Sequence, residues 1–188
     1  MGALEEIQKY AEDALSARRL QHVKGVVSAI TDLAENYGVN VQKAQTAAWL
    51  HDIAREWEKD RLQEVADTSN IPSEFCKVTE LLHGPVAACL GKSQFGIDDN
   101  EILDAVYFHT TGRSEMTLLD KLLFVADAIE PTRSYPGVEE IRNLAKTKLN
   151  AAVLTSINST ISYLIQTHRP IATLTVMTRN ALLGELYN

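Results

Sequence analysis

The chain has 188 residues, of which 45% are hydrophobic and 23% charged, the composition of an ordinary globular protein with its own apolar core. Its formal net charge of −7 at pH 7 argues against a nucleic acid polymer or an anionic membrane as main partner, because both bind clustered Lys and Arg. A small phosphorylated substrate needs only a few local cations. No apolar run is long enough to cross a membrane and no signal-peptide pattern is present, so we expect a cytoplasmic protein.

Apolar residues recur at the 3.6-residue spacing of helices along nearly the whole chain. In chain order, we expect a first helix that carries Leu4 and Leu15, a second over about 16–37, and a third that begins after Asn40 and runs through Ile53. Further helices are predicted near 59–67, 74–83, 85–95, 99–110, 117–129, 138–147, 150–168 and 172–186. Five prolines are expected at helix boundaries, namely Pro72, Pro85, Pro131, Pro136 and Pro170.

The sequence therefore predicts an all-α fold, a compact bundle of many helices without a convincing strand. We expect a single domain over residues 1–188, since no repeat, low-complexity tract or linker interrupts the pattern. Its core should lie over about 18–130, with C-terminal helices over 138–186 packed on it.

Side chains with metal-binding chemistry recur inside the predicted apolar helices. In chain order they are His22, the adjacent His51 and Asp52, His83, His109 and Asp127. One such residue is usually a hydrogen-bonded core histidine, or an aspartate beside an arginine, because an unpaired polar group in an apolar setting is costly. A series on successive helices is better explained by a shared divalent metal, which neutral imidazoles and carboxylates bind together. The adjacent pair, about 100° apart around a helix, could reach one centre from one side.

Other catalytic patterns are missing from the sequence. There is no His-Glu-x-x-His zinc motif, no Gly-rich phosphate loop and no Gly-x-Ser-x-Gly turn. The Glu-x-x-His spacing of di-iron bundles occurs at Glu80 and His83, but such a bundle needs two of these motifs. Cys76 and Cys89 form no framework, and we expect them to be buried structural thiols rather than metal ligands.

The ordered series resembles that of the HD-domain metal-dependent phosphohydrolases, and the residues around it extend the resemblance. The motifs are His22-Val-Lys-Gly-Val, Leu50-His51-Asp52-Ile-Ala-Arg55, His83-Gly-Pro-Val-Ala, His109-Thr-Thr-Gly, Asp127-Ala-Ile-Glu130-Pro131-x-Arg133, Tyr135-Pro-Gly-Val and Arg169-Pro-Ile-x-x-x-Thr. They are similar to one branch of that family, the YqeK-like symmetrical diadenosine tetraphosphatases, from about residue 18 to 183.

The resemblance implies an HD-domain bundle that hydrolyses diadenosine tetraphosphate (Ap4A) to two ADP with one or two divalent metals, commonly iron. It also implies a homodimer. Mn, Co, Ni or Zn would suit the same imidazole and carboxylate donors. The implied ligands of the principal metal are His22, His51, Asp52 and Asp127. His83 and His109 would face the open side, where they bind a second metal or substrate phosphates, and would act in catalysis with Asp52.

The resemblance also implies a substrate site. Arg55 and Arg133 are our candidates for the cations that bind the polyphosphate, and Arg55 stands where HD proteins often have Lys. Glu130 would orient a metal ligand or Arg133. Besides His83, His109 and Asp127, the expected nucleotide contacts are Thr110, Pro170, Ile171, Ala172, Thr173, Leu174 and Thr175.

Two other functions stay open. Another HD phosphohydrolase, acting on nucleotides, deoxynucleotides or guanosine alarmones, would share the metal ligands and differ in the substrate pocket. A metal-stabilised regulatory module without catalysis would be expected to lack part of the ligand set, and none of it is missing here.

Overall fold

The computed structural model describes residues 2–187, and this part of the chain forms eleven α-helices and no strand, which confirms the all-α prediction. The helices are α1 (Ala3–Ala14), α2 (Ala17–Tyr37), α3 (Val41–Leu50), α4 (Lys59–Thr68), α5 (Ser73–Cys76), α6 (Thr79–Ser93), α7 (Asn100–Phe108), α8 (Leu118–Ile129), α9 (Val138–Ala145), α10 (Leu149–Gln166) and α11 (Thr173–Tyr187). In the described residues, we find no helix with the length and apolar character needed to span a bilayer.

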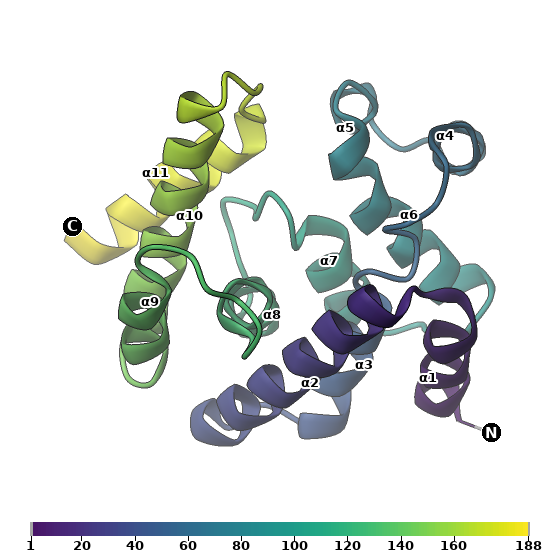
Figure 1. The fold of residues 1–188 in the computed structure, drawn as a ribbon, viewed down its shortest axis with the longest axis horizontal. Coiled ribbons are helices and arrows are strands. Elements are labelled where there is room, and N and C mark those ends of the chain that lie inside the picture. The colour runs from purple at the N-terminus through teal and green to yellow at the C-terminus, as the bar shows by residue number, and fades with distance from the viewer. Residues whose placement is uncertain (1, 188) are drawn as a thin grey trace.

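The helices are arranged around α8, which is apolar around most of its circumference. On one side, α8 packs against α2, α3 and α7, and α6 lies against α7. On the other side it packs against α9 and α10, with α11 on α10. Figure 1 shows the C-terminal helices α9–α11 on one side of the molecule and α4–α6 on the other, with α8 between them. One apolar cluster extends from Ile7 in α1 to Leu182 in α11, and a smaller one around Phe75 joins α4, α5 and α6.

Local sequence signals set the ends of the helices near the centre of the fold. The Ser16 hydroxyl accepts a hydrogen bond from the backbone N–H of Arg19 at the start of α2, and Asn40 does the same for Lys43 at the start of α3. Gly38 ends α2 at φ 71°, a left-handed conformation that glycine adopts without strain. These ends fix the two helices that present the first histidines of the series.

Two predicted boundaries were wrong. Pro85 lies inside α6 and does not divide it; the break comes earlier, between α5 and α6. A proline inside a helix removes one backbone hydrogen bond, and here the buried core packing of Val86 and Ala87 compensates. The third helix ends at Leu50, and residues 51–56 form turns with i to i+3 hydrogen bonds. His51 therefore directly follows the C-terminal end of α3 and does not project from the side of a longer helix.

Candidate metal centre and substrate cleft

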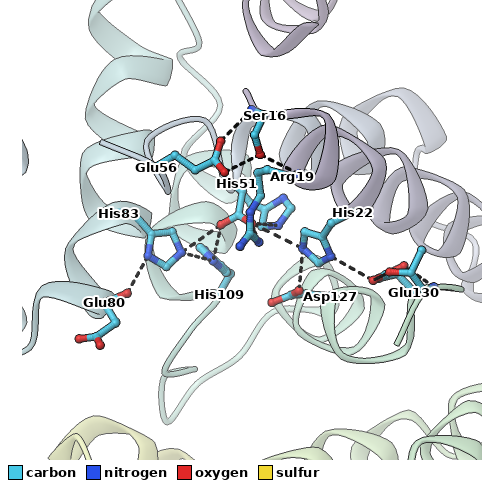
Figure 2. Close-up of polar contacts among 12 residues, drawn as sticks. Ser16, Arg19, His22, His51, Glu56, Glu80, His83, His109, Asp127 and Glu130 are labelled. Atoms are coloured by element: carbon cyan, nitrogen blue, oxygen red, sulfur yellow. Dashed lines mark hydrogen bonds and ion pairs between the residues drawn. The ribbon is translucent and has the colours of Figure 1, made fainter. Parts of the chain in front are cut away.

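Four of the five histidines meet at one point in the interior, brought there by four different helices. His22 comes from α2, His51 follows α3, His83 lies on α6 and His109 follows α7. All four are buried, and neighbouring ring centroids lie 4.9 to 5.7 Å apart. Figure 2 shows them around a common centre with Asp127 beside them. The fold thus gathers the series that was read along the chain.

Each of the four imidazoles uses its Nδ1 atom for a hydrogen bond directed away from the centre. Three acceptors are backbone carbonyl oxygens one turn back: Ala48 for His51 (2.6 Å), Glu80 for His83 (2.7 Å) and Val106 for His109 (2.7 Å). His22 donates to Glu130 Oε1 at 3.1 Å. Because carbonyl and carboxylate oxygens only accept, Nδ1 carries the proton in each ring. In the neutral rings the Nε2 lone pairs then face the centre, as metal-binding histidines require.

Two of these lone pairs have no hydrogen-bond partner. His22 Nε2 and His51 Nε2 are buried, and no group within residues 2–187 forms a hydrogen bond with either atom. His22 Nε2 lies 3.1 Å from Asp127 Oδ1, and both Nε2 atoms lie 3.4 to 3.5 Å from Asp52 Oδ2. A buried lone pair next to a carboxylate is unfavourable unless a cation lies between them. This set of imidazole and carboxylate donors therefore fits a divalent first-row metal.

Asp52 lies between the two pairs of histidines and turns one oxygen toward each. Its Oδ2 faces His22 and His51, whereas its Oδ1 lies 3.1 Å from His83 Nε2 and 4.0 Å from His109 Nε2. A carboxylate in this position can bind one cation with each oxygen. Asp52 could therefore be shared by two cations, one beside each pair of histidines. A carboxylate at the edge of the cluster could not be shared in this way.

The outer histidines come unusually close to each other. His83 Nε2 and His109 Nε2 are 3.0 Å apart, although in the neutral rings both atoms carry lone pairs. Two nitrogens at right angles on one metal, each about 2.1 Å from it, are also about 3.0 Å apart. Gly84 permits this approach of α6 to the end of α7, because a Cβ there would lie 3.0 Å from Val106 O and 3.1 Å from His109 Nδ1.

The ionisation of these groups suits a cation. Burial alone would raise the pKa of Asp52, but the neighbouring His51 holds it well below its ordinary value. Burial likewise opposes ionisation of Asp127, and the nearby His22, whose Nε2 lies 3.1 Å from Oδ1, nevertheless lowers its pKa. Burial lowers the pKa of His109 to about 3. At neutral pH the site therefore has negative carboxylates and a neutral His109, the states in which these groups bind metals.

Glu130 is buried behind His22 and keeps it oriented. Its pKa is lowered despite burial by hydrogen bonds from the side chain and backbone of Thr132, so the carboxylate is ionised. Gly25 lies one turn along α2 from His22, and a Cβ there would come within 2.6 Å of Glu130 Oε2. The absence of a side chain at Gly25 thus lets Glu130 reach the imidazole.

Two arginines pair with the carboxylates of the centre. Arg133 donates from Nη2 to Asp127 Oδ1 at 2.7 Å, and Arg19 donates from Nη1 to Asp52 Oδ2 at 2.7 Å. Arg133 was among the candidate residues, whereas Arg19 was missed. Its position three residues before His22 places both side chains on the same face of α2, and that spacing was the available signal.

A cleft of about 590 Å³ opens onto this centre. It is lined by the outer histidines and by five basic side chains, in a protein that is acidic overall: Arg19, Arg55, Lys77, Arg133 and Arg169. Of the predicted nucleotide contacts, Thr110, Pro170, Ala172 and Thr175 line the cleft as well. Ile171, Thr173 and Leu174 line a smaller cavity of about 180 Å³ that shares Pro170 and Ala172 with it. The hydroxyl of Thr110 is buried without a hydrogen-bond partner in the described part of the chain.

The two cysteines lie apart from the cluster. Cys76 and Cys89 are free and half-buried against the smaller apolar cluster, which is less burial than we expected. Neither belongs to a group of potential metal ligands among residues 2–187. The candidate metal site is thus made of nitrogen and oxygen donors.

Comparison with known proteins identifies the family of this chain. The profile of the HD domain family matches residues 19–132. Two curated relatives, each named bis(5'-nucleosyl)-tetraphosphatase, symmetrical, are 41% identical over 91% of this chain and 92% of the Halalkalibacterium halodurans protein, and 38% identical over 96% and 97% for Bacillus subtilis. The crystal structure of a predicted HD superfamily hydrolase involved in NAD metabolism from Clostridium acetobutylicum has a TM-score of 0.92 and 34% identity, over 96% of this chain and 97% of that one. The chain therefore belongs to the HD-domain family and, within it, to the group of the symmetrical bis(5'-nucleosyl)-tetraphosphatases.

Proposed function

We propose that this chain hydrolyses Ap4A symmetrically to two ADP in a metal-dependent reaction. The observation that carries the proposal is the convergence of four imidazole Nε2 atoms and two ionised carboxylates beside a basic cleft, which both carboxylates and two of the imidazoles line. Hydrolysis of a phosphoric anhydride depends mainly on positioning and on neutralisation of negative charge. The cluster of ligands and the basic side chains of the cleft can provide both the positioning and the charge neutralisation.

The inner ligand set for the principal metal would be His22, His51, Asp52 and Asp127. When bound, a divalent cation supplies Lewis acidity toward a phosphoryl oxygen and lowers the pKa of water. We propose iron as the resident metal, and the mixed nitrogen and oxygen donors would also accept Mn, Co, Ni or Zn. His83 and His109 would bind a second cation, with Asp52 shared between the two positions, or the substrate phosphates directly.

The protein side chains position the polyphosphate around the reacting phosphorus. Arg19 and Arg133 already lie at the carboxylates of the centre, and Arg55 lines the cleft beside them, so phosphate oxygens at the centre would meet guanidinium groups. The oxygen of water bonds to one of the two central phosphorus atoms. The bond from that phosphorus to the central bridging oxygen breaks, and each product is ADP. Asp52, His83 and His109 are the groups closest to this event.

The nucleoside of one ADP half would enter the smaller cavity. Its walls include Pro170, Ile171, Ala172, Thr173 and Leu174, in the segment predicted to bind the nucleotide. Thr110 and Thr175 line the larger cleft, and the Thr110 hydroxyl has no hydrogen-bond partner within residues 2–187, so we propose that it donates to a phosphate oxygen. The two cavities together offer a polar region for phosphates and an adjoining, more enclosed region for a base or ribose.

We further propose that residues 1–188 form one HD domain, with the core over 18–130 and the helices of 138–186 packed on it. The apolar cluster that extends from Ile7 to Leu182 supports this. We also propose a homodimer, on the resemblance to the family and on the exposed apolar side chains Tyr163, Ile165 and Met177 of α10 and α11.

The test is a product analysis on protein whose metal content has been measured by elemental analysis. Ap4A, dGTP and ppGpp are incubated separately, and the products are separated by anion exchange. We expect Ap4A to give ADP alone. Formation of AMP and ATP would contradict symmetrical cleavage, and consumption of dGTP or ppGpp with Ap4A intact would support the alternative substrates.

A further inference from the structure

One ion pair joins the two walls of the cleft at its mouth. Arg169, in the loop between α10 and α11, donates from Nη2 to Glu80 Oε1 in the first turn of α6. Within residues 2–187, no other hydrogen bond or ion pair links α10, α11 or their loop to α4–α6. Both residues line the cleft. In Figure 1 the helices that carry the two residues, α10 and α11 on one side and α6 on the other, are separated by α7 and α8.

The ion pair is weak, so another anion can take the place of Glu80 at Arg169. The side chain of Arg169 is 44% exposed and that of Glu80 is 47% exposed, so water screens their attraction and the bond adds little stability. Neighbouring phosphates of a polyphosphate chain together offer a guanidinium more oxygens and more negative charge than one carboxylate. A phosphate that reached Arg169 would therefore displace Glu80.

Glu80 lies next to His83, one of the two histidines that line the cleft. Its backbone carbonyl oxygen accepts the Nδ1 proton of His83 at 2.7 Å, which places its side chain one helical turn from that imidazole. The next residues along each wall, Leu81 and Pro170, line both the cleft and the smaller cavity. The ion pair thus lies where the cleft continues away from the metal ligands.

The other paired arginines of the cleft have a different place. Arg19 and Arg133 contact Asp52 and Asp127, the carboxylates of the centre itself. Of the three, only Arg169 pairs with no carboxylate of the ligand set. Phosphates at the centre would meet the first two arginines, and phosphates farther out would meet Arg169.

Resting on the proposed function, we infer that Arg169 binds the phosphates of the substrate half that lies away from the metal centre, and that Glu80 holds Arg169 when that half is absent. A four-phosphate chain extends past the centre and takes Arg169 from Glu80. A diphosphate product at the centre does not extend so far, and the ion pair forms again. Arg169 therefore favours binding of the substrate over binding of ADP, and Glu80 reduces this preference because it competes with the phosphates for Arg169.

The test compares two ligands on the metal-loaded protein by calorimetry. One is an uncleavable Ap4A analogue with a methylene group between the second and third phosphates, and the other is ADP. We expect Arg169→Gln to lower the affinity for the analogue about tenfold, the effect of one lost charge-assisted hydrogen bond. The affinity for ADP should change less than about twofold. Glu80→Gln should raise the affinity for the analogue a few-fold, on the order of two to five, and leave the affinity for ADP unchanged. Arg169→Lys, which keeps the charge, should retain most of the affinity.

The matched control is Glu185→Gln, which weakens the ion pair of Glu185 with Lys121 between α11 and α8, away from the cleft, and should change neither affinity. Equal losses for both ligands in Arg169→Gln would place Arg169 at the metal centre and overturn the inference. Unchanged affinity for the analogue would overturn it too, as would weaker binding of both ligands in Glu80→Gln. Ap4A turnover of the unaltered protein is measured on the same preparation. Its absence contradicts the proposed function, whereas normal turnover with an unaffected Arg169→Gln contradicts only this inference.

Discussion

The histidine cluster has two halves that are supported in different ways. The inner half is His22, His51 and Asp127, and the outer half is His83 and His109, with Asp52 between them. In the inner half a buried carboxylate, Glu130, holds one imidazole, and two Nε2 atoms have no hydrogen-bond partner within residues 2–187. In the outer half both rings are held by backbone carbonyl oxygens of their own helices and face the cleft. We therefore propose that the inner half holds the cation and that the outer half contacts the substrate.

Loss of a carboxylate from the inner half should have the largest effect. Asp127→Ala removes the acidic ligand that lies 3.1 Å from His22 Nε2 and leaves two buried lone pairs with less negative charge beside them. We expect loss of metal from the purified protein and a fall in Ap4A hydrolysis of about a thousandfold or more. Elemental analysis and a turnover assay check both. Full metal occupancy in this variant would remove Asp127 from the ligand set.

Loss of an imidazole from the outer half should separate catalysis from metal retention. His83→Ala and His109→Ala leave the inner donors and their supports in place. We expect each variant to keep its fold and the principal metal while turnover falls by about a hundredfold or more. Circular dichroism, elemental analysis and kinetics are measured on the same samples. Undiminished turnover in both variants would favour a different site, and a regulatory module without catalysis would show no turnover even before substitution.

The support behind the inner half can be tested without touching a ligand. Gly25→Ala would place a Cβ 2.6 Å from Glu130 Oε2 and push that carboxylate away from His22. Alanine favours a helix over glycine by about 1 kcal/mol, so helix propensity gives no reason to expect unfolding. We expect metal affinity to fall about ten- to a hundredfold, measured by competition with a chelator.

Glu130→Gln is the companion variant, because it keeps the shape of the side chain and removes its charge. A similar loss of affinity in both variants would attribute the effect to the contact between His22 and the ionised carboxylate of Glu130. If Gly25→Ala bound metal as tightly as the unaltered protein, the close approach of Glu130 would not matter for the metal.

The sequence predicts the members of the cluster better than their contacts. Each polar residue in an apolar helix is costly by itself, so the series His22 to Asp127 is visible along the chain. The helix ends at Gly38 and Asn40 also follow from local residue types. The continuation of α6 through Pro85 could not be predicted in this way, because the packing of neighbouring core residues decided it.

Contacts between distant segments have no local signal. Glu80 and Arg169 lie 89 positions apart, and nothing in either segment indicates the other. The orientation of Asp52, with one oxygen toward each half, depends on the turn that replaces the predicted end of the third helix. The donor types could therefore be derived from the sequence, whereas the division into halves needed the tertiary structure.

The smallest effect on Ap4A hydrolysis is expected from substitution of Arg55, in the wall of the cleft. Arg55 lines the cleft, and no side-chain hydrogen bond or ion pair holds it within residues 2–187. Arg55→Ala should raise the KM for Ap4A about tenfold, the effect of one lost charge-assisted hydrogen bond to phosphate, with metal content unchanged. Arg55→Lys keeps the charge but loses the planar pair of donors, so KM should rise only a few-fold, about two to four. If kcat fell by a larger factor than KM rose, Arg55 would instead act at the reacting phosphorus, near His83 and His109.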